Sequence, residues 1–190
     1  MDIQQSNIEE VLDALRAGKP VLVTDAEDRE NEGDAIIAAE FATPEWIAWM
    51  IRHTSGYICA PMTEERANEL HLPLMWVNTE DPHHTAYTVS VDAKARATTG
   101  ISASDRALTG RVLADPLSTA ASLIRPGHVI PLRAKAGGVL ERPGHTEAAV
   151  DLLKLAGLQP VAMMAELVND DGTMMKREEL FLMALRFDLP

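Results

Sequence analysis

Short apolar runs that are typical of buried strands alternate with helical patterns along almost the whole chain. Strands are predicted at residues 21–24, 35–39, 57–60, 87–91, 129–132 and 161–167. Helices are predicted at residues 8–18, 44–56, 63–70, 102–114 and 145–157, each bounded by a capping residue, a proline or a glycine. Some strands follow one another directly and others are separated by a helix. The sequence therefore predicts an α/β fold (α+β in some schemes), a three-layer α-β-α sandwich around a mixed twisted sheet.

No linker interrupts this alternation. Residues 72–85 read as a long loop, residues 116–126 as an irregular segment, and residues 169–172 have the chemistry of a hairpin turn. At 190 residues and 46% hydrophobic content, the chain is long enough for one ordinary core. We therefore expect a single domain over residues 1–190.

Charge and cysteine content exclude several classes of partner. The net charge of −12 disfavours nucleic acid and anionic membrane surfaces, so we expect neither as a partner. No apolar run reaches transmembrane length, and the start of the chain lacks a signal-peptide pattern. Cys59 is the only cysteine, which rules out a disulfide within the chain. These features predict a cytoplasmic protein.

Two short segments are unusual for a packed core. Residues 27–34 crowd several carboxylates around one arginine and one glycine, and residues 142–147 place His145 beside Arg142 in a Pro-Gly turn. Glu30 and His145 are candidate ligands of a divalent cation, with waters and substrate oxygens completing the site. The alternatives are that Glu30 belongs to a solvated loop and that His145 only caps a helix.

Arg142 and Thr146 flank His145 at the start of a predicted helix. Free N–H groups and the helix dipole favour an anion there, and an arginine can add two parallel hydrogen bonds. Phosphate is the natural candidate. The alternative is that Thr146 is an ordinary N-cap and that Arg142 pairs with a surface acid.

Other side chains suit proton transfer. Glu32 and Asp34 lie close to Glu30, and crowded carboxylates raise one another's pKa, although a flexible solvated run is equally compatible. His128 follows a Pro-Gly pair and could be an acid or base or a core histidine. Glu166 ends an apolar run, where an unpaired carboxylate is costly, so a functional role is favoured.

The remaining candidates are assigned no chemistry. Cys59 has no cationic neighbour in the sequence and reads as a buried structural residue. The other histidines lie in predicted helix ends and loops: His53, His71, His83 and His84.

Six ordered motifs carry a family resemblance. They are DRENEGD at residues 28–34, SGYIC at 55–59, TTGISA at 98–103, RPGH at 125–128, GGVL at 137–140 and GHTEAAVDL at 144–152. In this order the motifs closely resemble 3,4-dihydroxy-2-butanone 4-phosphate synthase of riboflavin biosynthesis, over about residues 8–174.

The resemblance implies a lyase that converts D-ribulose 5-phosphate to L-3,4-dihydroxy-2-butanone 4-phosphate and formate. It also implies dependence on Mg²⁺, with Mn²⁺ as an alternative ion, and a homodimer with active sites near the subunit interface. By position, Glu30 and His145 would bind the metal, and His128 and Glu166 would be required for catalysis. The sugar phosphate would be held by Arg29, Glu30, Asp34, Arg142, Pro143, Gly144, His145 and Thr146. The same pocket would be lined by Asp25, Glu32 and Cys59.

The end of the chain departs from the resemblance. Residues 175–180 leave the usual pattern, we expect a further strand and helix that do not follow, and no segment corresponds to a GTP cyclohydrolase II domain. Two other functions stay open: a magnesium-dependent sugar-phosphate isomerase that releases no formate, and a sugar-phosphate sensor without turnover.

Overall fold

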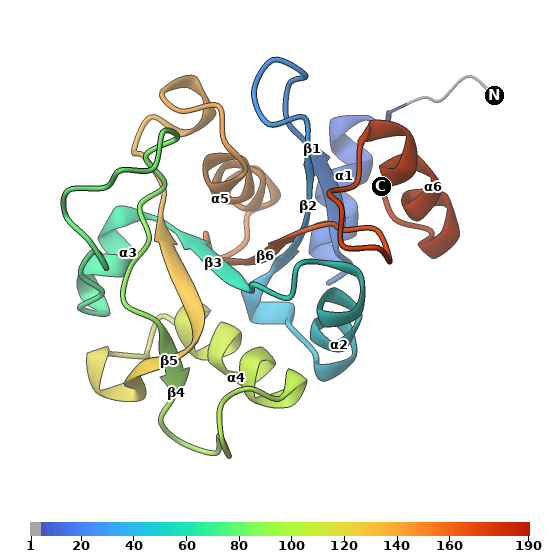
Figure 1. The fold of residues 1–190 in the computed structure, drawn as a ribbon. Coiled ribbons are helices and arrows are strands. Elements are labelled where there is room, and N and C mark those ends of the chain that lie inside the picture. The colour runs from blue at the N-terminus through green and yellow to red at the C-terminus, as the bar shows by residue number, and fades with distance from the viewer. Residues whose placement is uncertain (1–4) are drawn as a thin grey trace.

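The computed structural model describes residues 5–190, which form a six-stranded sheet with helices on both faces (Figure 1). The strands are β1 (Val21–Thr24), β2 (Gly33–Ala38), β3 (Cys59–Met62), β4 (Val91–Ala93), β5 (Leu123–Arg133) and β6 (Ala162–Glu166). They lie in the order β1-β2-β6-β3-β5-β4. Strands β3 and β5 are parallel, and the other neighbouring pairs are antiparallel. The predicted mixed sheet is therefore confirmed.

The helices form the two outer layers. Helices α1 (Ile8–Arg16) and α5 (His145–Ala156) pack on one face of the sheet, and α2 (Pro44–His53) and α4 (Ala103–Ala114) pack on the other. Helices α3 (Glu64–Glu69) and α6 (Arg177–Phe187) lie on opposite sides of the molecule (Figure 1). Three short 3-10 turns complete the structure: Ala39–Phe41, Ala120–Ser122 and Gly138–Leu140. The predicted α-β-α sandwich is confirmed. Within residues 5–190, no helix combines the length and apolar character needed to cross a bilayer.

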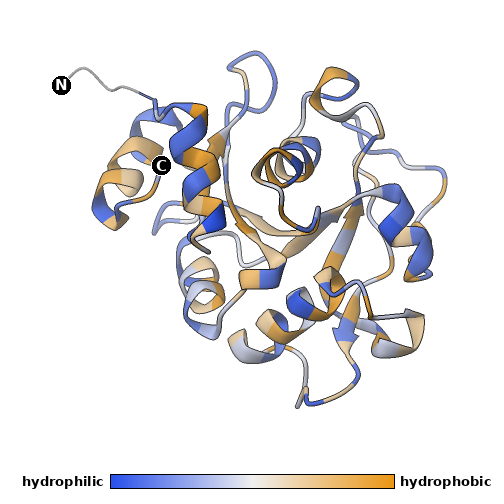
Figure 2. Ribbon diagram, turned by 180° about the vertical axis from the view of Figure 1, so that it is seen from behind, coloured by the Kyte–Doolittle hydropathy of each residue, from blue (hydrophilic) through white to orange (hydrophobic). Residues whose placement is uncertain are grey.

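Alternation along the strands divides the core in two. Ile36 and Met164 point toward α1 and α5, whereas Ile37 and Met163 point toward α2 and α4. Figure 2 shows the central strands mostly in hydrophobic colours, and helices banded in both colours. Full burial of each large apolar side chain contributes about 1.5–3 kcal/mol. The two cores therefore determine which face each strand residue must occupy.

The helix boundaries follow from local capping. Thr43 accepts a hydrogen bond from the backbone of Trp46 at 3.2 Å and precedes Pro44, the first residue of α2. Ser102 caps α4 in the same way. Helix α5 differs because its N-cap is Gly144, which has no side chain to offer. Its first N–H groups are thus left for another acceptor.

Two predictions around β4 and β5 were wrong. The predicted strand at residues 87–91 is reduced to isolated bridges at Tyr87 and Thr88, and β4 begins only at Val91. The segment predicted to be irregular, 116–126, includes the start of β5 at Leu123. A register shift between β4 and β5 lies beside Pro126 and the glycine after it, and such an irregularity lets proline occur within a strand.

The C-terminal part is more regular than expected. The predicted turn at 169–172 is confirmed, since Val168 bridges Met174 across it. Beyond it, α6 forms where the sequence indicated a departure from the family pattern. Leu180 of α6 packs against Gly33, where an added Cβ would lie 2.4 Å from a Leu180 methyl carbon.

Candidate functional site

The acidic loop between β1 and β2 is folded around one carboxylate. Asp25 accepts hydrogen bonds from the backbone of Glu30 at 3.0 Å and Glu32 at 2.9 Å, and from the Arg29 guanidinium at 2.8 Å. Burial alone would raise the pKa of Asp25, but these hydrogen bonds lower it overall. These hydrogen bonds fold the loop around Asp25. This arrangement disagrees with the alternative interpretation of the loop as a flexible, solvated segment.

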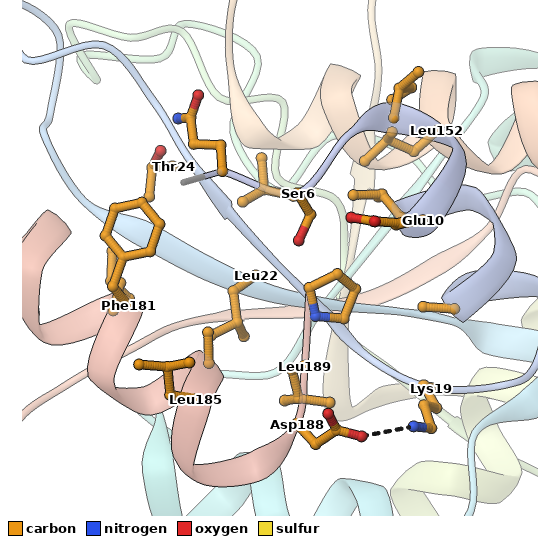
Figure 3. A pocket seen from close by; sticks show the side chains of 18 of the residues that line it. Ser6, Glu10, Lys19, Leu22, Thr24, Leu152, Phe181, Leu185, Asp188 and Leu189 are labelled. Carbon is orange, nitrogen blue, oxygen red and sulfur yellow. Dashed lines mark hydrogen bonds and ion pairs between the residues drawn. The ribbon is translucent and has the colours of Figure 1, made fainter. Parts of the chain in front are cut away.

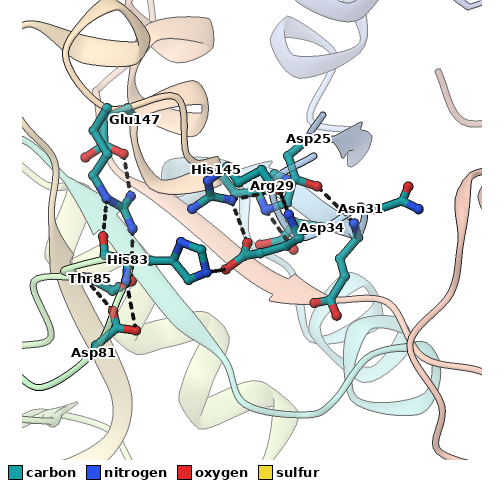
Figure 4. A network of polar contacts seen from close by, with 12 residues as sticks. Asp25, Arg29, Asn31, Asp34, Asp81, His83, Thr85, His145 and Glu147 are labelled. Carbon is teal, nitrogen blue, oxygen red and sulfur yellow. Dashed lines mark hydrogen bonds and ion pairs between the residues drawn. The ribbon is translucent and has the colours of Figure 1, made fainter. Parts of the chain in front are cut away.

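Arg29 lies beside Asp25 within this loop (Figure 4), and it also pairs with Glu30. Arg29 Nη1 is 2.8 Å from Asp25 Oδ2 and 2.6 Å from Glu30 Oε2. The other oxygen of Glu30 is 3.5 Å from His83 Nε2, a residue for which the sequence indicated no role. The Glu30 carboxylate is thus held between two loops that are distant in the sequence.

The start of α5 carries the second group of predicted residues. Arg142 Nη1 donates to Glu147 at 2.7 Å, its Nη2 donates to Thr85 Oγ1 at 2.9 Å, and its Nε donates to the His83 carbonyl at 2.9 Å. Glu147 is buried. Arg142 therefore pairs with a core carboxylate, and the surface-acid alternative is wrong.

The two arginines converge at the first residue of this helix end. A Cβ added to Gly144 would lie 2.4 Å from Arg142 Nη1 and 3.1 Å from Arg29 Nη2. Thr146 is buried in the first turn and is not the N-cap, which is Gly144. Two guanidinium groups next to free N–H groups at a helix N-terminus form a favourable environment for a phosphate.

His145 and Asp34 lie behind this anion site. His145 Nδ1 is 3.4 Å from Asp34 Oδ1, and both side chains are buried. Burial, together with the nearby charges of Glu166, Glu30, Glu32 and Asp25, raises the pKa of Asp34 well above its usual range. Burial also lowers the pKa of His145, although the carboxylates of Asp25 and Glu30 oppose this effect. A neutral imidazole is the form that binds a metal.

The donor atoms here fit a divalent cation. Within residues 5–190, His145 Nε2 and Asp34 Oδ1 are buried and have no hydrogen-bond partner. The charge of Glu30 raises the pKa of His145 against the effect of burial, which is compatible with both side chains facing the same region. No group of three or more His, Cys, Asp or Glu side chains in the described part of the chain could hold a metal. A site with two protein ligands would suit Mg²⁺, which keeps several waters or substrate oxygens.

The register of the sheet places the two predicted catalytic residues. Glu166 is the partner of Asp34 across β6 and β2. On β3, Cys59 pairs with Met164 of β6 on one side and with Ile130 of β5 on the other. Glu166 lies two residues beyond Met164, and His128 lies two residues before Ile130. Because β6 is antiparallel and β5 parallel to β3, both steps lead toward the same end of the sheet. By alternation both side chains face α5, and two interstrand spacings separate their strands by roughly 10 Å. Ser55, missed from the sequence, donates to Glu166 at 2.9 Å.

His128 has its own carboxylate partner. Its Nδ1 is 2.7 Å from Asp92 Oδ2. Asp92 was missed because β4 was predicted several residues too early. The only available signal was an acidic residue between the apolar Val91 and Ala93.

The residues expected to line the pocket behave differently from one another. Cys59 is buried, and burial raises the pKa of its thiol far above the usual range, so it stays protonated as a core residue. Glu32 has a pKa that burial raises, and Lys176 lies 4.0 Å away. Pro143 directly precedes the Gly144 N-cap of α5.

A separate hollow lies away from these residues (Figure 3). It has a volume of about 810 Å³ and lies between α1, β1 and α6. Its lining includes Leu22, Leu152 and Phe181 but none of the predicted site residues. The predicted site residues therefore gather near the ends of β2, β6 and α5 and not in this hollow.

Comparison with known proteins agrees with the geometry. The family described as 3,4-dihydroxy-2-butanone 4-phosphate synthase matches residues 9–190, which includes the C-terminal segment that the sequence indicated as divergent. Riboflavin biosynthesis protein RibBA of Salinispora arenicola is 60% identical over 173 residues, covering 91% of this chain and 41% of that protein. RibBA of Nocardia farcinica is 59% identical over 184 residues, covering 96% of this chain and 44% of that protein. The chain spans less than half the length of these relatives.

Solved structures show the same fold. A crystal structure of 3,4-dihydroxy-2-butanone 4-phosphate synthase in complex with two magnesium ions has a TM-score of 0.95 at 48% identity, over 97% of this chain and 91% of that one. The structure of the synthase of Candida albicans has a TM-score of 0.90 at 49% identity, again over 97% and 91%. Because nearly the whole chain matches in sequence and in fold, it belongs to the 3,4-dihydroxy-2-butanone 4-phosphate synthase family.

Proposed function

We propose that this chain acts in riboflavin biosynthesis as a lyase that converts D-ribulose 5-phosphate to L-3,4-dihydroxy-2-butanone 4-phosphate and formate. The observation that carries the proposal is the convergence of Arg29 and Arg142 at Gly144, beside the buried His145. This arrangement offers an anion site and a metal-capable imidazole within one helical turn. Family membership supports the same activity.

The phosphate would be held at the start of α5. Arg29 and Arg142 would supply charge, and the backbone of His145 and Thr146 would supply N–H donors, since the Gly144 N–H already donates to the Arg142 carbonyl at 2.8 Å. Because Arg142 is already fixed by three hydrogen bonds, little side-chain entropy is lost on binding. Binding at this end would leave the sugar carbons near Glu30, Asp34 and His145.

The metal ligands would be Glu30 and His145. Bound there, Mg²⁺ would supply positive charge that stabilises the negative enediolate formed from the sugar. Mn²⁺ prefers similar ligands and could substitute. The unpartnered Nε2 of His145 supports this assignment.

Proton transfers would be carried out by this chain's own side chains. The reaction removes a proton beside a carbonyl, loses water, shifts the carbon skeleton and expels one carbon. His128 and Glu166 would act as the acid and base groups, since they lie on one face at the same end of the sheet. Asp34 is protonated over an unusually wide pH range and could donate a proton beside His145.

One assay separates the possible functions. The chain is incubated with ribulose 5-phosphate, with Mg²⁺ or with excess chelator, and formate is measured. Formate that depends on the metal supports the lyase. An isomeric sugar phosphate without formate would instead indicate an isomerase, and binding without any turnover would indicate a sensor.

We also propose a cytoplasmic homodimer. Several large apolar side chains around α4 and β5 are exposed, and a second copy could cover them: Ile101, Leu117 and Ile124. Sedimentation velocity should give about twice the 20.7 kDa mass of one chain. A monomer at micromolar concentration would contradict this assembly.

A further inference from the structure

A buried carboxylate in β4 binds His128 through both of its oxygens. Asp92 Oδ2 lies 2.7 Å from His128 Nδ1, and Asp92 Oδ1 accepts the backbone N–H of His128 at 2.8 Å. The side chain of Asp92 is 11% exposed, whereas that of His128 is 41% exposed. The carboxylate therefore lies on the inner side of the pair, and the ring reaches outward from it.

The surrounding backbone holds this pair tightly. A Cβ on Gly100 would lie 2.0 Å from Asp92 Oδ2 and 2.6 Å from His128 Nδ1. A Cβ on Gly127 would lie 2.0 Å from the carbonyl carbon of Val91. Glycine is needed at both positions because the chain passes directly over the contact. The close packing restricts the ring of His128 to this orientation.

The turn that carries Gly100 is itself fixed. Asp105 accepts hydrogen bonds from the backbone of Thr98 at 3.0 Å and of Gly100 at 3.0 Å, and from the Thr98 hydroxyl at 2.6 Å. The start of α4 thus fixes the turn through Asp105, and the turn packs Gly100 against the contact between Asp92 and His128. A surface histidine without a function has no need of such support.

The contact determines the position of the ring proton. An ionised carboxylate only accepts hydrogen bonds, so His128 Nδ1 must carry the hydrogen that Asp92 Oδ2 receives. In a neutral imidazole the other nitrogen, Nε2, then carries the lone pair. A base that removes a proton from a sugar carbon needs this lone pair.

We propose that Asp92 is a positioning residue that holds His128 with its proton on Nδ1 and keeps Nε2 available as the base. The proposal rests on the proposed function, in which His128 transfers protons. Both hydrogen bonds that the Asp92 side chain accepts come from His128, so Asp92 acts through that residue. Its role resembles that of a carboxylate that orients a catalytic histidine in a hydrolase triad.

The variant Asp92→Asn tests this proposal because the backbone N–H of His128 fixes the orientation of the new side-chain amide. The His128 N–H can only donate, so it selects the amide oxygen at the position of Oδ1. The amide NH₂ is then turned toward His128 Nδ1, which must accept. The proton of the neutral ring is forced onto Nε2, and the lone pair that the reaction needs is lost.

The direct measurement is the tautomer of His128. The chain is labelled with ¹⁵N-histidine, and the His128 signals are assigned by their loss in His128→Gln. At a pH where the ring is neutral, the wild-type protein should show the proton on Nδ1, and Asp92→Asn should show it on Nε2. Wild-type protein with the proton on Nε2 would overturn the proposal without any variant.

Kinetics give a second, independent test. Asp92→Asn should lower kcat for formate release by about 100-fold or more, the scale of general acid–base catalysis, with little change in KM. Asp92→Ala removes the carboxylate but forces neither tautomer, so it should retain more activity than Asp92→Asn, although it loses more stability. If Asp92 had a purely structural role, Asp92→Asn would keep more activity than Asp92→Ala, and that result would overturn the proposal.

Controls separate this inference from the proposed function. Asp115→Asn alters another carboxylate that accepts a backbone N–H, from Leu117 at 2.9 Å, and should leave turnover unchanged. If wild-type protein released no formate, the proposed function would fail. The tautomer measurement would still test whether Asp92 holds the His128 proton on Nδ1. If wild-type protein were active and Asp92→Asn equally active, only the positioning role would fail.

Discussion

The glycine at the start of α5 allows a sharp test of the anion site. In Gly144→Ala the new methyl group would lie 2.4 Å from Arg142 Nη1, so the guanidinium has to move. It cannot move freely, because that same nitrogen binds the buried Glu147 at 2.7 Å. The backbone of Gly144, with φ −111° and ψ 161° in the extended region, is accessible to alanine, so the effect comes from the contact alone.

The magnitude follows from the broken contact. Leaving Glu147 with one partner fewer costs about 1–3 kcal/mol of stability. Replacing glycine by alanine at an N-cap adds roughly 0.5–1 kcal/mol. Loss of one charge-assisted hydrogen bond to phosphate weakens binding by about 1.5–3 kcal/mol, which corresponds to a rise in KM of about 10- to 100-fold.

Gly157→Ala is the matched control at the other end of the same helix. Its Cβ would meet no atom within 4 Å, but its φ of +74° strains alanine, at a cost of about 1–2 kcal/mol. Both variants should therefore unfold at lower urea concentration, and only Gly144→Ala should have a raised KM for ribulose 5-phosphate. Equal KM values in the two variants would refute the placement of the phosphate at this helix end.

Three further predictions follow from the site and its surroundings. Glu166→Gln should keep the fold and its hydrogen bond to Ser55 but lose most formate release, measured beside its circular dichroism; near-normal turnover would contradict the acid–base role. The hydrogen bonds from Thr98 lower the pKa of Asp105 to about 2 from an ordinary 3.8, so its stabilising contribution is complete above about pH 4 and is lost as pH falls toward 2. Asp105→Asn should flatten the pH dependence of unfolding in that window, and an unchanged slope would refute the assignment. Cys59 should react with a maleimide only after unfolding, because its thiol is buried and protonated, and fast labelling of native protein would contradict this.

Much of this fold could be predicted because its signals are local. Caps at Thr43 and Ser102 and the stop at Gly157 determine helix ends within a few residues of chain. The boundaries that failed, at β4 and the start of β5, depend on a register shift between strands far apart in the sequence. No local pattern encodes such a shift, because the partner strand determines it.

For the candidate site, too, local sequence signals could be read and those that depend on distant partners could not. Glu30, Asp34 and His145 could be proposed as site residues because unusual residue types gather in short segments of the sequence. Asp92 and His83 could not, since each gains significance only from a partner on another element. The role of Gly144 was also hidden, because the space it leaves for two arginines exists only after folding.

Because side chains alternate between the two faces of the sheet, the same rows of β2 and β6 contain both core residues and candidate site residues. Ile36 and Met164 fill the layer beneath α5, and Asp34 and Glu166 continue the same rows two residues further on. A single-residue insertion in β6 would therefore rotate Glu166 into the opposite hydrophobic layer and turn an apolar neighbour toward the candidate site. Such strands tolerate length changes only in steps of two, which constrains how the chain can evolve at this end of the sheet.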